Sequence, residues 1–74
     1  MFGLRNKVED PATRLRILMA ERNVNVNELA DMAGVSRHTI TRLRTGLVQR
    51  PTYATAYLVF RALGVKVNSI WSDY

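Results

Sequence analysis

A chain of 74 residues is long enough for one small domain, and its 47% hydrophobic residues suffice for a compact core. The absence of cysteine excludes disulfide bridges and thiolate metal sites, and no apolar run approaches the roughly 18 residues that a membrane span needs. The net charge is +5, and no acidic residue lies between Asp31 and Asp73, so this interval favours a polyanionic partner: nucleic acid first, an anionic membrane or an acidic protein second.

The first predicted helix lies in "DPATRLRILMAERNV", residues 10–24. Asp10 is its expected N-cap, Pro11 suits the first helical position, and Asn23 is its expected stop. Before it, residues 1–10 are predicted to form an N-terminal arm that has neither the apolar core nor the cleavage site of a signal peptide. The spacing of the apolar residues predicts an inner helix face made of Leu15, Leu18 and Met19.

Two further helices are predicted over residues 25–33 and 36–45, separated by Gly34. Asn25 caps the earlier helix, with Glu28 completing a capping box, and Ser36 caps the later one. Glycine readily adopts the left-handed geometry that ends a helix, so the earlier helix is expected to end at Gly34 and the later one at Gly46. The inner positions expected for these two helices are Leu29, Ala30, Met32, Ala33, Ile40 and Leu43, with Val35 filling the corner between them.

A fourth helix is predicted to open at Pro51 and to stop at Gly64, with Ala56, Val59, Phe60 and Leu63 facing inwards. The remaining segment, "VKVNSIWSDY", is predicted to form a short fifth helical turn capped by Asn68, although "VKV" also suits a short extended piece. Ile70 and Trp71 are its apolar anchors. Taken together, the pattern predicts an all-α fold of five short helices in residues 11–74.

Two short helices joined by a tight turn at Gly34 make a helix-turn-helix. The stretch "ELADMAGVSRHTITRL", followed by "GLVQRP" and "ALGVKVNSIW", resembles the lambda-repressor-like helix-turn-helix family of the Cro/C1 type, from about Arg14 to Trp71. The resemblance implies a compact all-α domain that binds a double-stranded DNA operator in the cytoplasm of a bacterial or phage-infected cell. It implies no cofactor, no metal and no small-molecule ligand.

The family reads the major groove with its third helix. The resemblance implies, position by position, that the base-reading residues are Arg37, His38, Thr41 and Arg42. Arginine suits this role because it can donate two hydrogen bonds at once, to guanine O6 and N7. Three positions depart from the family pattern: Val26 stands where a glutamine is common, and Met19 with Arg44 replaces a common Arg–Glu pair. The phosphate-binding candidates are Asn25, Asn27, Ser36, Arg44, Thr45, Gln49, Arg50 and Thr52.

Each of these signals has a simpler explanation beside it. The arginines of the third helix could form an ordinary solvated face, but no neighbouring acid compensates them. His38 is the single histidine, so it has no second member for a metal site. Ser36 and His38 resemble a nucleophile and its base superficially, yet no carboxylate follows to orient the histidine, and we expect no catalysis. RNA binding is disfavoured because no aromatic stacking positions lie among the arginines.

Two functions remain. The first is a Cro-like repressor or modulator that binds DNA as a homodimer, with a dimer contact from Val65, Val67, Ile70, Trp71 and Tyr74. The second is an antirepressor that keeps the fold and binds a partner repressor through Leu47, Val48 and Tyr57. Leu47 and Val48 could instead serve local packing. Tyr53, Tyr57, Phe60 and Trp71 are expected mainly in the core, with Tyr57 and Trp71 partly exposed.

Overall fold

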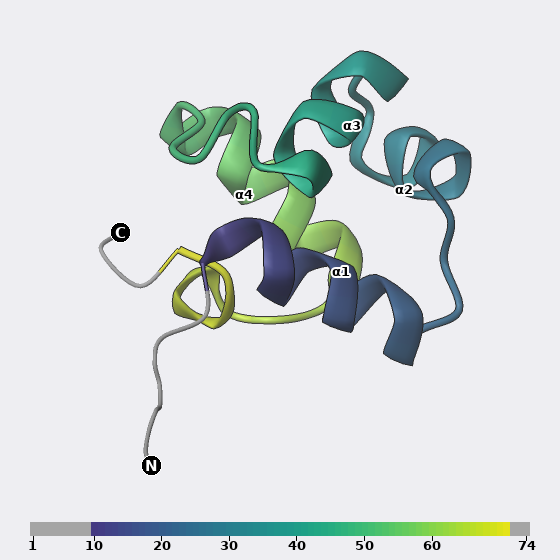
Figure 1. The fold of residues 1–74 in the computed structure, drawn as a ribbon. Coiled ribbons are helices and arrows are strands. Elements are labelled where there is room, and N and C mark those ends of the chain that lie inside the picture. Colours follow the sequence, from purple (N-terminus) through teal and green to yellow (C-terminus); the bar gives the residue numbers. More distant parts are fainter. Residues whose placement is uncertain (1–9, 72–74) are drawn as a thin grey trace, which may run out of the picture.

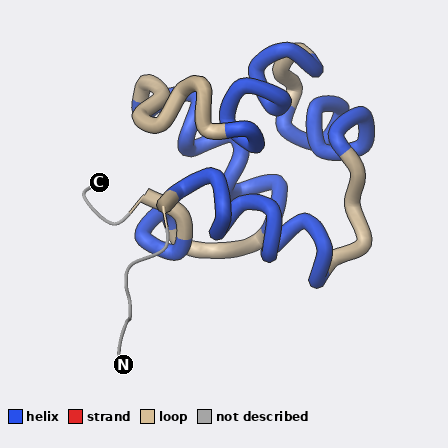
Figure 2. The backbone as a smooth tube through the Cα atoms, viewed as in Figure 1, coloured by secondary structure: helices blue, strands red, loops and turns tan. Residues whose placement is uncertain are grey.

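The computed structural model describes residues 10–71, which form four α-helices and one 3-10 turn (Figure 1). These described residues contain no strand, so the all-α class is confirmed (Figure 2). The predicted arm before Asp10 and the predicted contact residue Tyr74 lie outside the described residues. The elements are α1 (Pro11–Glu21), α2 (Val26–Ala33), α3 (Arg37–Thr45), α4 (Tyr53–Leu63) and η2 (Val67–Ser69).

The expected count of five helices is wrong, because the last element is a single 3-10 turn of three residues. The Ser69 N–H donates to the Lys66 carbonyl at 2.9 Å and closes this turn. Gly64 has already ended α4, and Ile70 and Trp71 are buried directly after the turn. Too few residues therefore remain for an α-helix, and the alternative of an extended "VKV" piece is also wrong.

Local hydrogen bonds set most helix boundaries where the sequence predicts them. The side chains of Asp10, Asn25 and Ser36 each accept a hydrogen bond from the backbone N–H three residues later, at 2.9, 2.8 and 3.2 Å. Glu28 completes the capping box by accepting from the Asn25 N–H at 3.0 Å. Hydrogen bonds from Thr13, first from its hydroxyl and then from its backbone N–H, hold the pKa of Asp10 below its ordinary value of 3.8.

The start of α4 differs from the prediction. The helix begins at Tyr53 and not at Pro51, because the Thr52 hydroxyl accepts the Thr55 N–H at 3.3 Å and acts as N-cap. Pro51 is buried beneath the preceding loop. A capping threonine therefore outweighs the preference of proline for the first helical position.

One core joins all the elements: α1 packs on α3, α2 packs on both α3 and α4, and α4 contacts η2. Met32 was predicted to face inwards but is 54% exposed. The buried stripe of α2 runs through Leu29, Ala30 and Ala33, which leaves Met32 at its edge. The fully buried centre of the core consists of Leu15, Leu29, Ile40, Ala56, Val59 and Trp71.

Two arginines of α1 and Arg22, which caps its end, tie this helix to the carboxyl ends of other elements. Arg14 Nε donates to the Ser69 carbonyl, Arg16 Nη1 donates to the Arg44 carbonyl, and Arg22 Nε donates to the Leu63 carbonyl, each at 2.6 Å. The last carbonyls of a helix have no partner inside the helix, and positive charge is favoured at that end. Figure 1 shows α1 lying beside η2.

Trp71 is a core residue and closes the domain. Its side chain is 1% exposed, and its indole N–H donates to the Gln49 carbonyl at 3.1 Å. Ile70 is buried as well. The expectations that Trp71 is partly exposed and that both residues supply a protein contact are therefore wrong, since the residues already fill the core between α4 and the loop after α3.

Replacing the Trp71 indole tests how much its burial and its hydrogen bond stabilise the domain. We expect Trp71→Phe to lower the free energy of unfolding by about 1–3 kcal/mol, because the Gln49 carbonyl loses its buried donor and the smaller ring leaves space. Urea denaturation followed by far-ultraviolet circular dichroism measures the effect. Tyr57→Phe, which changes a partly exposed ring, is the control and should leave stability within about 0.5 kcal/mol of the wild type. Equal stability of both variants would contradict the described role of Trp71.

Candidate nucleic-acid interface

The helix-turn-helix is built by α2, a turn of three residues and α3. Gly34 adopts φ +75°, a left-handed conformation that favours glycine, and its N–H donates to the Ala30 carbonyl at 2.9 Å. The Val35 N–H donates to the same carbonyl at 3.1 Å, and the Val35 side chain packs half-buried against the core. Ser36 then caps α3 at once. The two helices consequently meet closely at the small, buried Ala30.

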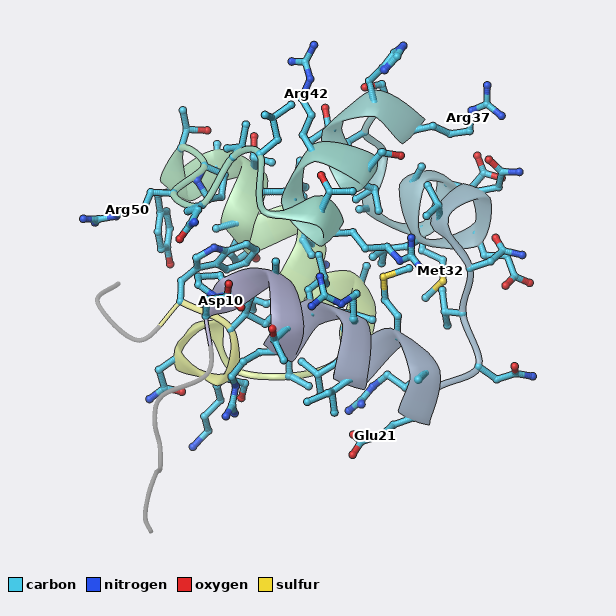
Figure 3. All side chains as sticks on the ribbon, in the orientation of Figure 1. Asp10, Glu21, Met32, Arg37, Arg42 and Arg50 are labelled. Atoms are coloured by element: carbon cyan, nitrogen blue, oxygen red, sulfur yellow. The ribbon has the colours of Figure 1, made fainter. Side chains whose placement is uncertain are left out.

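Helix α3 divides cleanly into a buried and an exposed side. Ile40 and Leu43 are buried beneath it against α1 and α2. Figure 3 shows Arg37 and Arg42 projecting away from the body of the molecule, on the side opposite Glu21. All four predicted base-reading residues are exposed, together with two of the phosphate candidates: Arg37, His38, Thr41, Arg42, Arg44 and Thr45.

The positive charge on α3 is not compensated by neighbouring acids. Within residues 10–71, neither Arg37 nor Arg42 nor Arg44 forms an ion pair, whereas Arg22 approaches Glu21 at 3.7 Å on α1. Arg37 makes one long hydrogen bond, from Nη1 to the Asn27 Oδ1 at 3.4 Å. Guanidinium groups that are exposed and unpaired attract a polyanion and can donate to it in pairs.

The first turn of α2 borders the exposed side of α3 and extends it. Two open hollows lie along this border, of about 360 and 390 Å³, and both are lined by Val26 and Asn27. The larger one reaches Asn25 and Arg44, and the smaller one reaches Arg37, His38 and Thr41. The structure thus brings three of the four predicted base-reading residues of α3 next to Asn27 of α2, and Arg44 next to Asn27 and the N-cap Asn25; Arg42 lines neither hollow. The α3 arginines, His38, Thr41, Asn25 and Asn27 are called the α3 surface below.

The comparison with protein families decides what this arrangement is. The family model of the Cro/C1-type helix-turn-helix DNA-binding domain matches residues 14–70. The chain belongs to this Cro/C1-type family. No significant match was found among curated proteins or among solved structures. Membership makes the chain a DNA-binding domain of the kind found in transcription regulators, a family that is typically not enzymatic, and it confirms the resemblance deduced from the sequence.

Within the Cro/C1-type domain, several predicted phosphate ligands already serve the ends of helices. The side-chain oxygens of Asn25, Ser36 and Thr52 cap α2, α3 and α4. The Thr45 hydroxyl donates to the Thr41 carbonyl at 2.9 Å. The Ser36 and Thr52 hydroxyls already have two partners each, the backbone N–H and the hydroxyl of the residue three positions later. By contrast, Asn27, Arg44, Gln49 and Arg50 are exposed side chains without a capping role. Arg50 projects on a different side of the molecule from Arg37 (Figure 3).

The residues predicted to contact another protein differ in their exposure. Leu47 is 77% exposed, while Val48 is half-buried and packs against the core, so Val48 serves local packing. Tyr57 is 39% exposed, as expected. Val65 is half-buried and packs against the core, and the side chain of Val67 lies outside what the structure describes.

Sequence reasoning missed two exposed residues of α4. Tyr53 is 56% exposed, although it was expected in the core, and Leu58 is also exposed. Tyr53 and Tyr57 have ring centroids 6.4 Å apart, and the Arg61 guanidinium lies 5.8 Å from the centroid of the Tyr57 ring. The spacing of positions 53, 57, 58 and 61 along one helix face was the signal that could have identified this surface. We call Tyr53, Tyr57, Leu58 and Arg61 the outer face of α4.

The part of the chain that the structure describes contains neither a membrane-spanning helix nor a candidate metal site. No helix within residues 10–71 is long and apolar enough to cross a bilayer. Those residues also bring together no group of three or more His, Cys, Asp or Glu side chains that could hold a metal ion.

Removing one positive charge from the α3 surface, and in a separate variant from the outer face of α4, tests which of the two sides faces DNA. We expect Arg44→Ala to weaken binding to a random-sequence duplex and to reduce the slope of log K against log salt by about 1, because one phosphate contact is lost. Fluorescence anisotropy at several salt concentrations measures both quantities. Arg61→Ala on the outer face of α4 removes the same charge and should leave the slope unchanged. Equal slopes for the two variants would contradict the assignment of the DNA-facing side.

Proposed function

We propose that the protein is a sequence-specific transcription regulator of the Cro-like repressor or modulator type, which reads the DNA major groove with α3. The observation that carries this proposal is the exposed and unpaired set Arg37, Arg42 and Arg44 on one helix. An arginine can donate two hydrogen bonds at once to guanine O6 and N7, and each such pair contributes roughly 1–3 kcal/mol of discrimination against a wrong base.

In this proposal the amino-terminal part of α3 contacts base edges. Arg37, His38, Thr41 and Arg42 are the base-reading residues, since they are exposed along successive turns that start at the helix N-terminus. The phosphate contacts hold the domain in register on the duplex. They come from Asn27, Arg44, Gln49 and Arg50, with additional hydrogen bonds from the capping groups Asn25, Ser36, Thr45 and Thr52.

A two-fold dimer on a pseudo-palindromic operator completes the proposal. Ile70 and Trp71 are buried, so their side chains are not available for the dimer contact. Leu47 and the outer face of α4 offer exposed apolar side chains for it. Aromatic residues are enriched in such contacts because they bury much area with few rotatable bonds.

Selection of duplexes from a random pool by the purified protein tests the proposal. The expected winner is palindromic, with half-sites one helical turn apart, and binds about 10³-fold or more tighter than an unrelated duplex at each of two salt concentrations. On this winner, Arg37→Ala and Arg42→Ala should each relax the preference at a single base position. Weak, salt-sensitive binding without any enriched sequence would reject the proposal, since the charge would then be generic.

A second candidate function is that of an antirepressor or modulator that binds a partner repressor protein. It is favoured by Leu47, a large apolar side chain that is 77% exposed in the loop between α3 and α4. Val26 also supports this candidate, because it lines both hollows of the α3 surface without offering a hydrogen bond. Both functions are compatible with the same fold.

Two variants compared in cells that express the protein separate the candidates. For a DNA-binding regulator, we expect Arg42→Ala to abolish the change in transcription and Leu47→Lys to preserve it, because an added cation near DNA does not weaken binding. For a partner-binding modulator, we expect Leu47→Lys to abolish the change in transcription and Arg42→Ala to preserve it. Transcript levels relative to cells without the protein provide the measurement. Leu47→Lys is used without a change at Val48, because Val48 packs against the core and its replacement would lower stability.

A further inference from the structure

The end of α3 is held by a side chain that does not belong to the α3 surface. Arg16 of α1 donates through Nη1 to the Arg44 carbonyl at 2.6 Å and through Nη2 to the Thr13 hydroxyl at 3.1 Å. Thr13 in turn donates its backbone N–H to the Asp10 carboxylate at 2.9 Å. A chain of hydrogen bonds thus runs from the N-cap of α1 to the last turn of α3.

The last turn of α3 packs on the core through Leu43 but has few other hydrogen bonds. The Val48 N–H donates to the Arg42 carbonyl at 3.1 Å, and the Thr45 hydroxyl donates to the Thr41 carbonyl at 2.9 Å. Both bonds are local, so they shape the helix end without joining it to another helix. The bond from Arg16 spans 28 positions of sequence and connects α3 to α1 directly. It satisfies a carbonyl that has no partner inside the helix, and it sets a positive charge where the helix dipole is negative.

The placement of this bond along α3 matters. Arg44 carries the bonded carbonyl, and its own side chain belongs to the α3 surface. Of the base-reading candidates, Arg37 and His38 lie nearly two turns earlier, next to the Ser36 cap, whereas Thr41 and Arg42 lie within one turn of Arg44. Loss of the bond therefore loosens the carboxyl-terminal turn, which carries both Arg42 and Arg44. Every duplex must restore the same turn on binding, so the cost is shared by all duplexes whatever their bases.

We propose that Arg16 is a positioning residue for DNA binding, which holds the carboxyl-terminal turn of α3 against α1 without touching DNA. This inference rests on the proposed function of α3 as the DNA-reading element. Its consequence is specific: removal of Arg16 weakens binding to every duplex by a similar factor and leaves the base preference unchanged. An arginine that contacted a base would instead lose preference at one position.

The chain offers two matched controls. Arg14 lies in α1 and Arg22 caps its end, and each donates to a carbonyl at 2.6 Å, but these carbonyls belong to Ser69 and Leu63 and not to α3. Arg14 is the closer match, because Arg22 also approaches Glu21 at 3.7 Å. Alanine at position 14, 16 or 22 removes one positive charge and one arginine–carbonyl bond in each case. A difference between the variants then reports on where the bond ends and not on charge.

The first arm measures amide hydrogen exchange in the protein without DNA. We expect Arg16→Ala to accelerate exchange of the amides of Arg44, Thr45 and Val48 by about tenfold relative to the amides of α4, because a hydrogen bond from a charged donor is lost. Arg14→Ala and Arg22→Ala should leave this ratio unchanged. Thr13→Val, which removes the acceptor that orients Arg16 and retains the helix cap, should give a smaller change in the same direction.

The second arm measures affinity for the duplex selected by the wild type and for single-base variants of it. Arg16→Ala should weaken all of them by about five- to tenfold, more than Arg14→Ala does, with the ratios between duplexes retained. Arg16→Lys keeps the charge but not the two-pronged geometry, and should recover only part of the loss. If Arg16→Ala is too unstable to measure, Thr13→Val and Arg16→Lys test the same bond.

The outcomes separate the inference from the function on which it rests. Exchange at the end of α3 that matches the controls, or an affinity loss equal to that of Arg14→Ala, overturns the positioning role. A changed base preference overturns it too, since Arg16 would then act at the bases. A wild-type protein that selects no duplex rejects the proposed function, and with it the role of Arg16 in DNA binding; the exchange arm still decides whether Arg16 holds α3.

Discussion

The arrangement of this small domain depends on how the carboxyl ends of its helices find partners. Each helix ends in carbonyl groups that no residue of the same helix can satisfy. Here α1 and its C-cap residue supply donors to three such ends, through Arg14, Arg16 and Arg22. The bonds fix α3, α4 and η2 against one helix, with Leu15 fully buried between them. In a chain without cysteine, these bonds and the core replace the covalent staples that other small domains use.

Arginine consequently has two distinct tasks in this molecule. On α1 the guanidinium groups turn towards backbone carbonyls and stabilise the fold. On α3 the guanidinium groups of Arg37 and Arg42 project into solvent, without ion pairs among the described residues. The net charge of the chain does not distinguish these tasks, but their position does. The α3 surface keeps its charge available for a polyanion because the buried side of the helix is formed by Ile40 and Leu43 alone.

The features that sequence analysis predicted correctly are those that local chemistry decides. Asp10, Asn25 and Ser36 cap their helices because a short polar side chain can reach a backbone N–H three residues later, whatever the rest of the chain does. Gly34 ends α2 for a similarly local reason. The family was also predicted from the motif, and the family comparison confirmed it. The exposed side of α3 follows from helical periodicity.

The features that could not be predicted depend on contacts between distant residues. Trp71 was predicted as an apolar anchor with partial exposure, but its ring is fully buried, and the Gln49 carbonyl, 22 positions away, accepts the indole N–H that burial removes from water. Arg16 is indistinguishable in sequence from any surface arginine, and its role appears with the position of the Arg44 carbonyl. Tyr53 and Leu58 are exposed because α4 packs on α2 and η2 through its other side. Which of the exposed α3 residues contact bases stays a prediction, since that depends on the DNA.

The central claim is that α3, with the first turn of α2, is the side that meets DNA. The most direct test is an NMR titration of the isotope-labelled protein with its selected duplex, observing backbone amides and arginine side chains. We expect intermolecular contacts from Arg37, Thr41 and Arg42 to base protons, and chemical-shift changes that extend to Asn25 and Asn27. At the outer face of α4 we expect no contacts to DNA, and shift changes only where two protein copies meet. Contacts to base protons from α4, or shift changes that avoid α3, would contradict this claim.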